Sequence, residues 1–188
     1  MTYKAPARSV GRLKRPFGDL YYEVTGTGPA LLFAHGLGGN HLSWWQQVAH
    51  FAPHYTCVSF AHRGFAPSSA IDGGPDPADY ASDLAALIDH LRFPDVRLVG
   101  QSMGGWTMLE YAIAHPAKVK ALVLSSTSGT LDRRGGADVV FPAFLASAIA
   151  AALPCGQAHL IPHAGHSPYF EEAATFNGLV EAFLARQR

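Results

Sequence analysis

The chain has 188 residues, of which 48% are apolar and 15% charged. This composition predicts one globular domain with a sizeable core, and it excludes a disordered chain. The fourteen basic and fourteen acidic residues cancel, so the charge predicts neither a nucleic-acid partner nor attraction to an anionic membrane.

Strands and helices alternate along the chain. The strands we expect span Ser9–Lys14, Tyr21–Thr25, Ala30–Ala34, Thr56–Phe60, Val96–Gly100, Ala121–Ser125 and Ala158–Ile161. The helices we expect span Leu42–Phe51, Ala78–Leu91, Met103–Ala114, Phe141–Leu153 and Phe170–Arg188. Helices of this length between strands require crossover connections. The pattern therefore predicts an α/β fold with a mostly parallel sheet flanked by helices, in one domain over 1–188.

Two of these helices carry apolar residues at helical spacing, which predicts a buried face on each. The first set is Tyr80, Leu84, Leu87, Ile88 and Leu91, and the second is Phe176, Val180, Phe183 and Leu184. Between the two helices, the segment 127–138 is polar and rich in glycine. It predicts a short connection rather than a further strand.

The two cysteines, Cys57 and Cys155, lie far apart and predict no disulfide framework. Cys57 falls in an apolar strand, where we expect a small buried side chain. The most apolar run, Phe141–Leu153, is too short to cross a bilayer, and the first residues do not have the pattern of a signal peptide. We therefore expect a soluble, cytoplasmic protein.

The stretch Val-Gly-Gln-Ser-Met-Gly-Gly places Ser102 between Gly100 and Gly104, where a predicted strand meets a predicted helix. Glycines permit a tight turn because they lack a Cβ. A serine on such a turn is presented outward, as a nucleophile requires. A phosphate-binding turn is the competing interpretation, but the chain has no P-loop pattern and no dinucleotide fingerprint to support it.

A serine hydroxyl needs a base within hydrogen-bonding distance. We assign that role to His166, in the loop between the last predicted strand and the last predicted helix, because parallel sheets place active sites beyond strand ends. His163 is the nearest rival and lies closer to the strand. The other histidines have no zinc-site spacing, so no metal is expected.

A second glycine-rich turn, His35-Gly-Leu-Gly-Gly39, follows the apolar strand Ala30–Ala34. Backbone N–H groups in such a turn can converge on a developing oxyanion. We expect the donors to be the backbone amides of Leu37 and Met103.

Together these motifs resemble the α/β-hydrolase superfamily, in particular its small bacterial esterase and C–C hydrolase-like branch. The matching stretches are His-Gly-Leu-Gly-Gly (35–39), Ser-Trp-Trp (43–45), His-Arg-Gly-Phe (62–65), Gly-Gln-Ser-Met-Gly-Gly (100–105) and Ala-Gly-His-Ser-Pro (164–168). The resemblance implies an α/β-hydrolase fold, no cofactor and a Ser-His-Asp triad.

The resemblance also points to Asp138 as the acid, because Gly-Ala-Asp-Val-Val-Phe-Pro (136–142) is similar to the acid loop of the family. Asp138 precedes His166 by 28 positions (166 − 138), which suits that pattern. Asp132 is the alternative, since some members carry the acid after the sixth strand.

The chain departs from the family in two places. It passes from 125–131 almost directly to Asp138, so we expect the lid and one strand of the family to be missing. Ala61 also stands where the family usually has an aspartate. Without a lid, apolar residues around Ser102 would face solvent, and we expect a second copy of the chain to cover them through Phe141–Leu153.

These observations predict a serine hydrolase that cleaves small carboxylic esters through an acyl-enzyme. The residues expected to line its pocket are Gly36, Trp106, Phe141 and Tyr169. A C–C hydrolase or a thioesterase uses the same machinery and stays open. A non-catalytic member of the fold that binds a ligand or a partner is the alternative of a different class.

Overall fold

The computed structural model describes residues 6–127, 147–148, 150–151 and 156–187. The described residues form a six-stranded sheet in the order β1-β2-β4-β3-β5-β6. The strands are β1 Arg8–Arg15, β2 Gly18–Thr25, β3 Ala30–Ala34, β4 Thr56–Phe60, β5 Val96–Gln101 and β6 Val119–Ser125. Strands β3 to β6 run parallel, whereas β1 and β2 form an antiparallel hairpin that joins the sheet through β4. The predicted mostly parallel sheet is confirmed.

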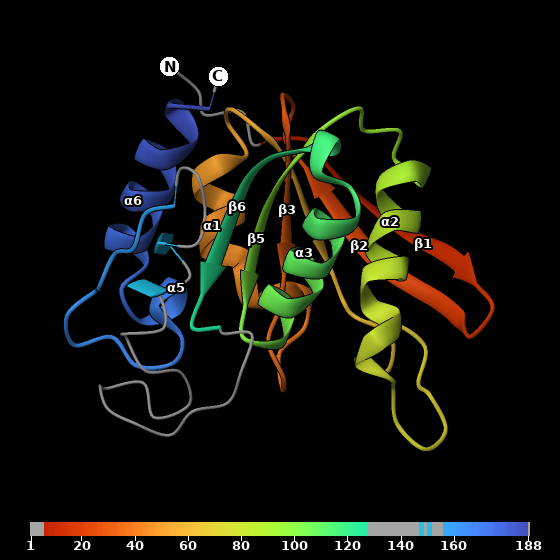
Figure 1. Ribbon diagram of the computed structural model, residues 1–188. Coiled ribbons are helices and arrows are strands. Elements are labelled where there is room, and N and C mark those ends of the chain that lie inside the picture. Colours follow the sequence, from red (N-terminus) through yellow and green to blue (C-terminus); the bar gives the residue numbers. More distant parts are fainter. Residues whose placement is uncertain (1–5, 128–146, 149, 152–155, 188) are drawn as a thin grey trace.

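Helices cover both faces of this sheet (Figure 1). The α-helices are α1 Trp45–Phe51, α2 Tyr80–His90, α3 Met103–Ala114, α5 Pro168–Glu171 and α6 Ala173–Ala185. Short 3-10 turns are η1 His41–Trp44, η2 Pro77–Asp79 and η3 Pro116–Lys118. Helices α2 and α3 contact each other on one face, and α1 and α6 contact each other on the opposite face.

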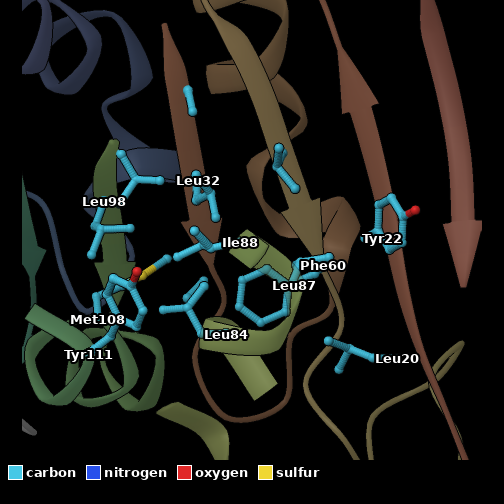
Figure 2. Packing of buried hydrophobic residues seen from close by; sticks show 14 residues of the cluster. Leu20, Tyr22, Leu32, Phe60, Leu84, Leu87, Ile88, Leu98, Met108 and Tyr111 are labelled. Carbon is cyan, nitrogen blue, oxygen red and sulfur yellow. The ribbon is translucent and has the colours of Figure 1, made fainter. Parts of the chain in front are cut away.

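Figure 2 shows the core between the sheet and the first helical layer. Leu32 on β3 and Leu98 on β5 point from the sheet toward Leu84 and Ile88 on α2 and Met108 on α3, and all five are fully buried. The predicted buried face of α2 is confirmed, with Leu91 half-buried at its end.

The opposite face of the sheet forms a second core. Alternate residues of the same strands, among them Phe33 on β3 and Val99 on β5, pack against α1 and α6. The apolar stripe predicted for the last helix lies here, with Phe176, Val180 and Leu184 buried and Phe183 half-buried. Because β3 and β5 are covered on both faces, every residue of each is buried. The sequence of β3 is accordingly a continuous apolar run, whereas β5 also buries the polar side chains of Arg97 and Gln101.

The structure corrects the sequence prediction at the C-terminal side of the chain. The strand predicted for Ala158–Ile161 is wrong, because these residues form neither helix nor strand and pair with no described strand. Residues 156–160 are exposed, and Leu160 is 73% exposed. Strand propensity alone cannot hold an extended segment that has no partner.

The predicted helix Phe170–Arg188 begins earlier and is divided into α5 and α6. The division falls at Glu172, whose φ of −128° and ψ of 48° lie outside the helical region. Pro168 starts α5, a position where its missing N–H has no cost.

Some predictions fall on residues outside the described ones. These are Asp132, Asp138, Phe141, Cys155 and most of the predicted helix Phe141–Leu153, of which 147–148 and 150–151 are helical. The other cysteine, Cys57, is 1% exposed as predicted, and burial raises the pKa of its thiol to about 12. Within the described residues, no helix has both the length and the apolar character needed to cross a bilayer.

Candidate active site

Ser102 is the single residue between the end of β5 and the start of α3. Its φ of 51° and ψ of −119° lie in a region that L-residues seldom adopt. The backbone N–H of Ser102 donates to the carbonyl of Ser125 at 3.0 Å, at the end of the adjacent strand β6. The Ser102 carbonyl accepts from the Thr127 hydroxyl at 2.9 Å. Hydrogen bonds to both the N–H and the carbonyl of Ser102 therefore fix a sharp turn at this residue.

The glycines that flank Ser102 allow strand and helix to cross closely. A Cβ on Gly100 would lie 2.5 Å from the carbonyl oxygen of Gly104, and a Cβ on Gly104 would collide with the carbonyl oxygen of Ala34. Any larger residue at either position would push α3 away from the sheet. The close crossing explains why this turn carries glycines on both sides of the serine.

The turn after β3 lies directly against Ser102. A Cβ on Gly36 would be 3.2 Å from the Ser102 Cβ, and it would overlap the side-chain oxygen of Gln101. Leu37, the next residue, is 80% exposed. No hydrogen bond between described residues uses the Leu37 N–H.

Met103 is the first residue of α3. Its N–H has no acceptor inside the helix, because the first turn of a helix leaves its N–H groups without partners. The structure thus places both predicted oxyanion donors, the amides of Leu37 and Met103, in the two backbone turns that adjoin Ser102. Their convergence on a single oxyanion stays a prediction.

His166 lies in the segment that leads into α5, and this segment is fastened at several backbone atoms. The Gln101 side chain donates to the His166 carbonyl at 3.0 Å. The Glu171 carboxylate accepts the N–H groups of Gly165 and Ser167, on either side of His166, at 2.7 and 2.8 Å. Since Gln101 precedes Ser102, its bond attaches the His166 segment to the strand end that carries the serine.

The proposed acid residues, Asp138 and Asp132, are outside the described residues, so the third member of the triad stays a prediction. His163, the rival base, is exposed and has a φ of 67°. His166 lines the pocket described below, and His163 is not among its lining residues.

Sequence reasoning missed a chain of buried hydrogen bonds beneath the site. His35 Nδ1 lies 2.8 Å from the Gly36 carbonyl, and since a carbonyl can only accept, Nδ1 carries the proton. His35 Nε2 then accepts from the His62 backbone N–H at 3.0 Å and lies 3.1 Å from His62 Nδ1. His62 Nε2 lies 3.0 Å from the Thr107 hydroxyl on α3.

This chain of bonds links the turn at Gly36 to helix α3. His35 is 0% exposed and His62 is 1% exposed. Burial lowers the pKa of His35 to about 4 and lowers the pKa of His62 well below its ordinary value, so both rings are neutral at neutral pH. His35 directly before the glycine turn was the available sequence signal, but nothing local in the sequence pairs it with His62.

The loop after β4 is fixed by Arg63, despite the alanine at position 61. The Arg63 guanidinium donates two hydrogen bonds to the Asp83 carboxylate on α2, at 2.6 and 2.8 Å, and also contacts Asp79. Arg15 on β1 donates to the same Asp83 carboxylate at 2.8 Å. The Asp83 side chain is 2% exposed. These ion pairs tie the loop that contains His62 to α2 and to β1.

A pocket of about 360 Å³ opens between the turn after β3 and the His166 segment. Gln101, the residue before Ser102, lines it, whereas Ser102 and Met103 are not among its lining residues. Gly36, Gln101 and His166 form its inner wall. Its outer wall is apolar and consists of Leu37, Leu42, Trp45 and Phe170. Of the predicted pocket residues, Gly36 and Tyr169 line it, whereas Trp106 is on α3 and is not among its lining residues.

Tyr169 forms the floor of this pocket. It is 8% exposed and packs on the fully buried Trp44, with ring centroids 4.2 Å apart. Its hydroxyl is within hydrogen-bonding reach of the Ser43 and Ser167 hydroxyls, and burial raises its pKa. Among the described residues, no group of three or more His, Cys, Asp or Glu is arranged to hold a metal ion.

Comparison with known proteins supports the same fold. Residues 29–139 match the family model described as alpha/beta hydrolase fold. A thermophilic esterase from Thermogutta terrifontis superposes with a TM-score of 0.85 at 19% identity, over 95% of this chain and 99% of that chain. At that identity the likeness concerns the fold.

Curated relatives match the chain over a shorter stretch. 3-Oxoadipate enol-lactonase 2 from Acinetobacter baylyi is 34% identical over 103 residues, which is 55% of this chain and 39% of the relative. Fluoroacetate dehalogenase from a Burkholderia species is 39% identical over 106 residues, which is 54% of this chain and 35% of the relative. The chain thus spans well under half the length of these curated relatives.

Proposed function

The chain belongs to the alpha/beta hydrolase fold family, and on that premise we propose that it is a serine hydrolase that cleaves small carboxylic esters. The observation that carries the proposal is the turn at Ser102, a serine with positive φ between β5 and α3. Two further features support it: the backbone turn with Leu37 that lies against the serine, and the Gln101 bond that attaches the His166 segment to the same strand end.

In the proposed reaction, His166 accepts the proton of the Ser102 hydroxyl while Ser102 Oγ attacks the ester carbonyl carbon. The carbonyl oxygen gains negative charge, and the amides of Leu37 and Met103 stabilise it. The carbon–oxygen bond to the alcohol then breaks, and His166 gives its proton to the departing oxygen. Water, activated by His166, hydrolyses the acyl-enzyme and restores the Ser102 hydroxyl.

We assign the acid that orients His166 to Asp138, with Asp132 as the alternative. The named activity of one curated relative fits ester hydrolysis, because an enol-lactone is a cyclic ester. Ser102 disfavours a dehalogenase mechanism that needs an aspartate at this turn.

The test is labelling with a fluorophosphonate probe together with turnover of p-nitrophenyl acetate. We expect the probe to label Ser102, and we expect Ser102→Ala to lose labelling and to lower kcat by at least about 1000-fold. His166→Asn should lose turnover to a similar degree. His163→Asn is the matched control, since it changes a neighbouring exposed histidine. Asparagine tolerates the positive φ of this position, so the backbone need not change.

The assignment of the acid is tested in the same assay. We expect Asp138→Asn to lower kcat severely and Asp132→Asn to leave it nearly unchanged, and the reverse result would move the role to Asp132. A folded wild-type chain that is neither labelled nor active on esters would contradict the proposal and favour a non-catalytic, ligand-binding member of the family.

A further inference from the structure

The pocket between the turn after β3 and the His166 segment contains much of the apolar surface that the described residues expose. Eight large apolar side chains are exposed among them, and four of these eight line this one pocket: Leu37, Leu42, Trp45 and Phe170. Their exposed fractions run from 57% to 80%. Apolar side chains scattered over a surface need no explanation, but a group that surrounds one hollow is typical of a binding site.

Two polar side chains of the same pocket bond to other residues that line it. The Tyr169 hydroxyl reaches the Ser43 and Ser167 hydroxyls. The Gln101 amide donates to the His166 carbonyl. Among the described residues that line the pocket, none is Asp, Glu, Lys or Arg. A charged substituent would therefore lose its hydration without meeting an oppositely charged side chain among these residues, which disfavours its entry.

The position of the pocket indicates which side of an ester it receives. His166 lines it, together with the turn at Gly36 and Leu37. In ester cleavage the base must later protonate the departing oxygen, so the alcohol part of the ester lies on the side of that histidine. The carbonyl oxygen faces the Leu37 amide on the proposed arrangement, and the alcohol chain then extends between these two walls.

We propose that this pocket, with Trp45 and Phe170 as its specificity-determining residues, binds the uncharged apolar alcohol group of the ester substrate. The inference rests on the proposed function and adds the substrate class: esters of apolar alcohols with a small acyl group. The volume of the pocket, about 360 Å³, is at the lower end of the range for small-molecule pockets.

Isomeric esters provide the test, because they differ only in which side of the carbonyl carries the alkyl chain. We compare kcat/KM for methyl, butyl and hexyl acetate with kcat/KM for methyl acetate, methyl pentanoate and methyl heptanoate. Burial of a methylene in an apolar site gives roughly threefold to fourfold in kcat/KM at most. We expect the alkyl acetates to gain roughly twofold to fourfold per methylene, and the methyl alkanoates to gain much less.

Variants of the wall assign the effect to this pocket. Trp45→Ala and Phe170→Ala should lower kcat/KM for hexyl acetate more than kcat/KM for methyl acetate, which flattens the dependence on alcohol length. Ile113→Ala is the matched control, because it removes another exposed apolar side chain, 71% exposed, from the helix that follows Ser102. Equal dependence on acyl and alcohol length, or identical behaviour of all three variants, would overturn the inference and leave the proposed function intact.

A binding measurement separates the pocket from the chemistry. In Ser102→Ala, hexyl acetate should shift the NMR resonance of the Trp45 indole N–H more than methyl heptanoate does. If the wild type hydrolyses no ester but this shift occurs, the proposed function fails and the pocket stands. No shift of the Trp45 resonance with hexyl acetate would overturn the pocket itself.

Discussion

At the serine turn, the space between strand β5 and helix α3 limits which residues fit. Gly100 is the clearest case. A Cβ there would lie 2.5 Å from the Gly104 carbonyl oxygen. We expect Gly100→Ala to lower the free energy of unfolding by about 2 kcal/mol, because the helix must move off the sheet. Urea denaturation followed by circular dichroism measures the change.

Gly178 is the control for Gly100. It lies within α6, and a Cβ at this position would meet nothing within 4 Å. Gly178→Ala should raise the free energy of unfolding by roughly 0.5 to 1 kcal/mol, because alanine favours a helix interior more than glycine does. Loss of stability of similar size in both variants would show that close packing at Gly100 is not the cause.

At the scale of elements, the Asp83 carboxylate connects helix α2, strand β1 and the loop after β4. Asp83 on α2 accepts from Arg63 in the loop after β4 and from Arg15 on β1. Its side chain is 2% exposed, and that of Arg63 is 11% exposed. Asp83→Asn would leave two guanidinium groups without their buried counter-ion. We expect the free energy of unfolding to fall by about 2 to 3 kcal/mol in urea denaturation, since Asp79 still pairs with Arg63.

The matched variant is Asp89→Asn on the same helix. Asp89 pairs with Lys118 at 2.9 Å, but its side chain is 68% exposed and solvent screens the pair. We expect no measurable change in its unfolding midpoint. An equally small effect of Asp83→Asn would mean that the Arg63 cluster does not stabilise the loop that holds His62.

At the scale of the whole molecule, the buried histidines make stability depend on pH. An unfolded histidine binds a proton below about pH 6.5, whereas His35 in the fold does so only below about 4. Between these values the unfolded chain holds more protons, so stability is full above pH 6.5 and falls as the pH drops. His35 alone lowers the free energy of unfolding by roughly 3 kcal/mol as the pH falls across that window. His41, with a pKa also lowered by burial, acts in the same direction.

We expect His62→Gln to show a shallower loss of stability between pH 7 and 5 than the wild type, because one buried group no longer takes up a proton on unfolding. Urea midpoints across that range measure it. His54→Gln, at an exposed site, should run parallel to the wild type. If the urea midpoints of all three proteins changed with pH in parallel, the prediction that the buried His62 ring is neutral would be contradicted.

The central sheet and the turn at Ser102 were predictable because their signals are local. The apolar run of β3 identifies a buried parallel strand, and the glycines at 100 and 104 identify a close crossing, without any knowledge of distant residues. His62 was not predictable as a partner of His35, because the two are 27 positions apart and only the pairing of β3 with β4 brings them together.

The strand predicted for Ala158–Ile161 shows the opposite error. Its composition suits a strand, but a strand exists only with a neighbour, and composition does not reveal whether a neighbour is present. The Gln101 bond to the His166 segment was missed for the same reason as the histidine pair, since it joins residues 65 positions apart.

Both backbone turns around Ser102 emerge from interior strands. Strand β3 is bonded to β4 on one side and β5 on the other, and β5 is bonded to β3 and β6. Fraying begins at margins, where fewer bonds must open. Strand β4 separates β3 from the outer β1–β2 hairpin, so fraying of that hairpin leaves the glycine turn and the serine in place. The opposite margin of the described sheet is different, because the edge strand β6 pairs with β5 and its Ser125 carbonyl accepts the Ser102 N–H. Opening of β6 would therefore reach the serine turn directly.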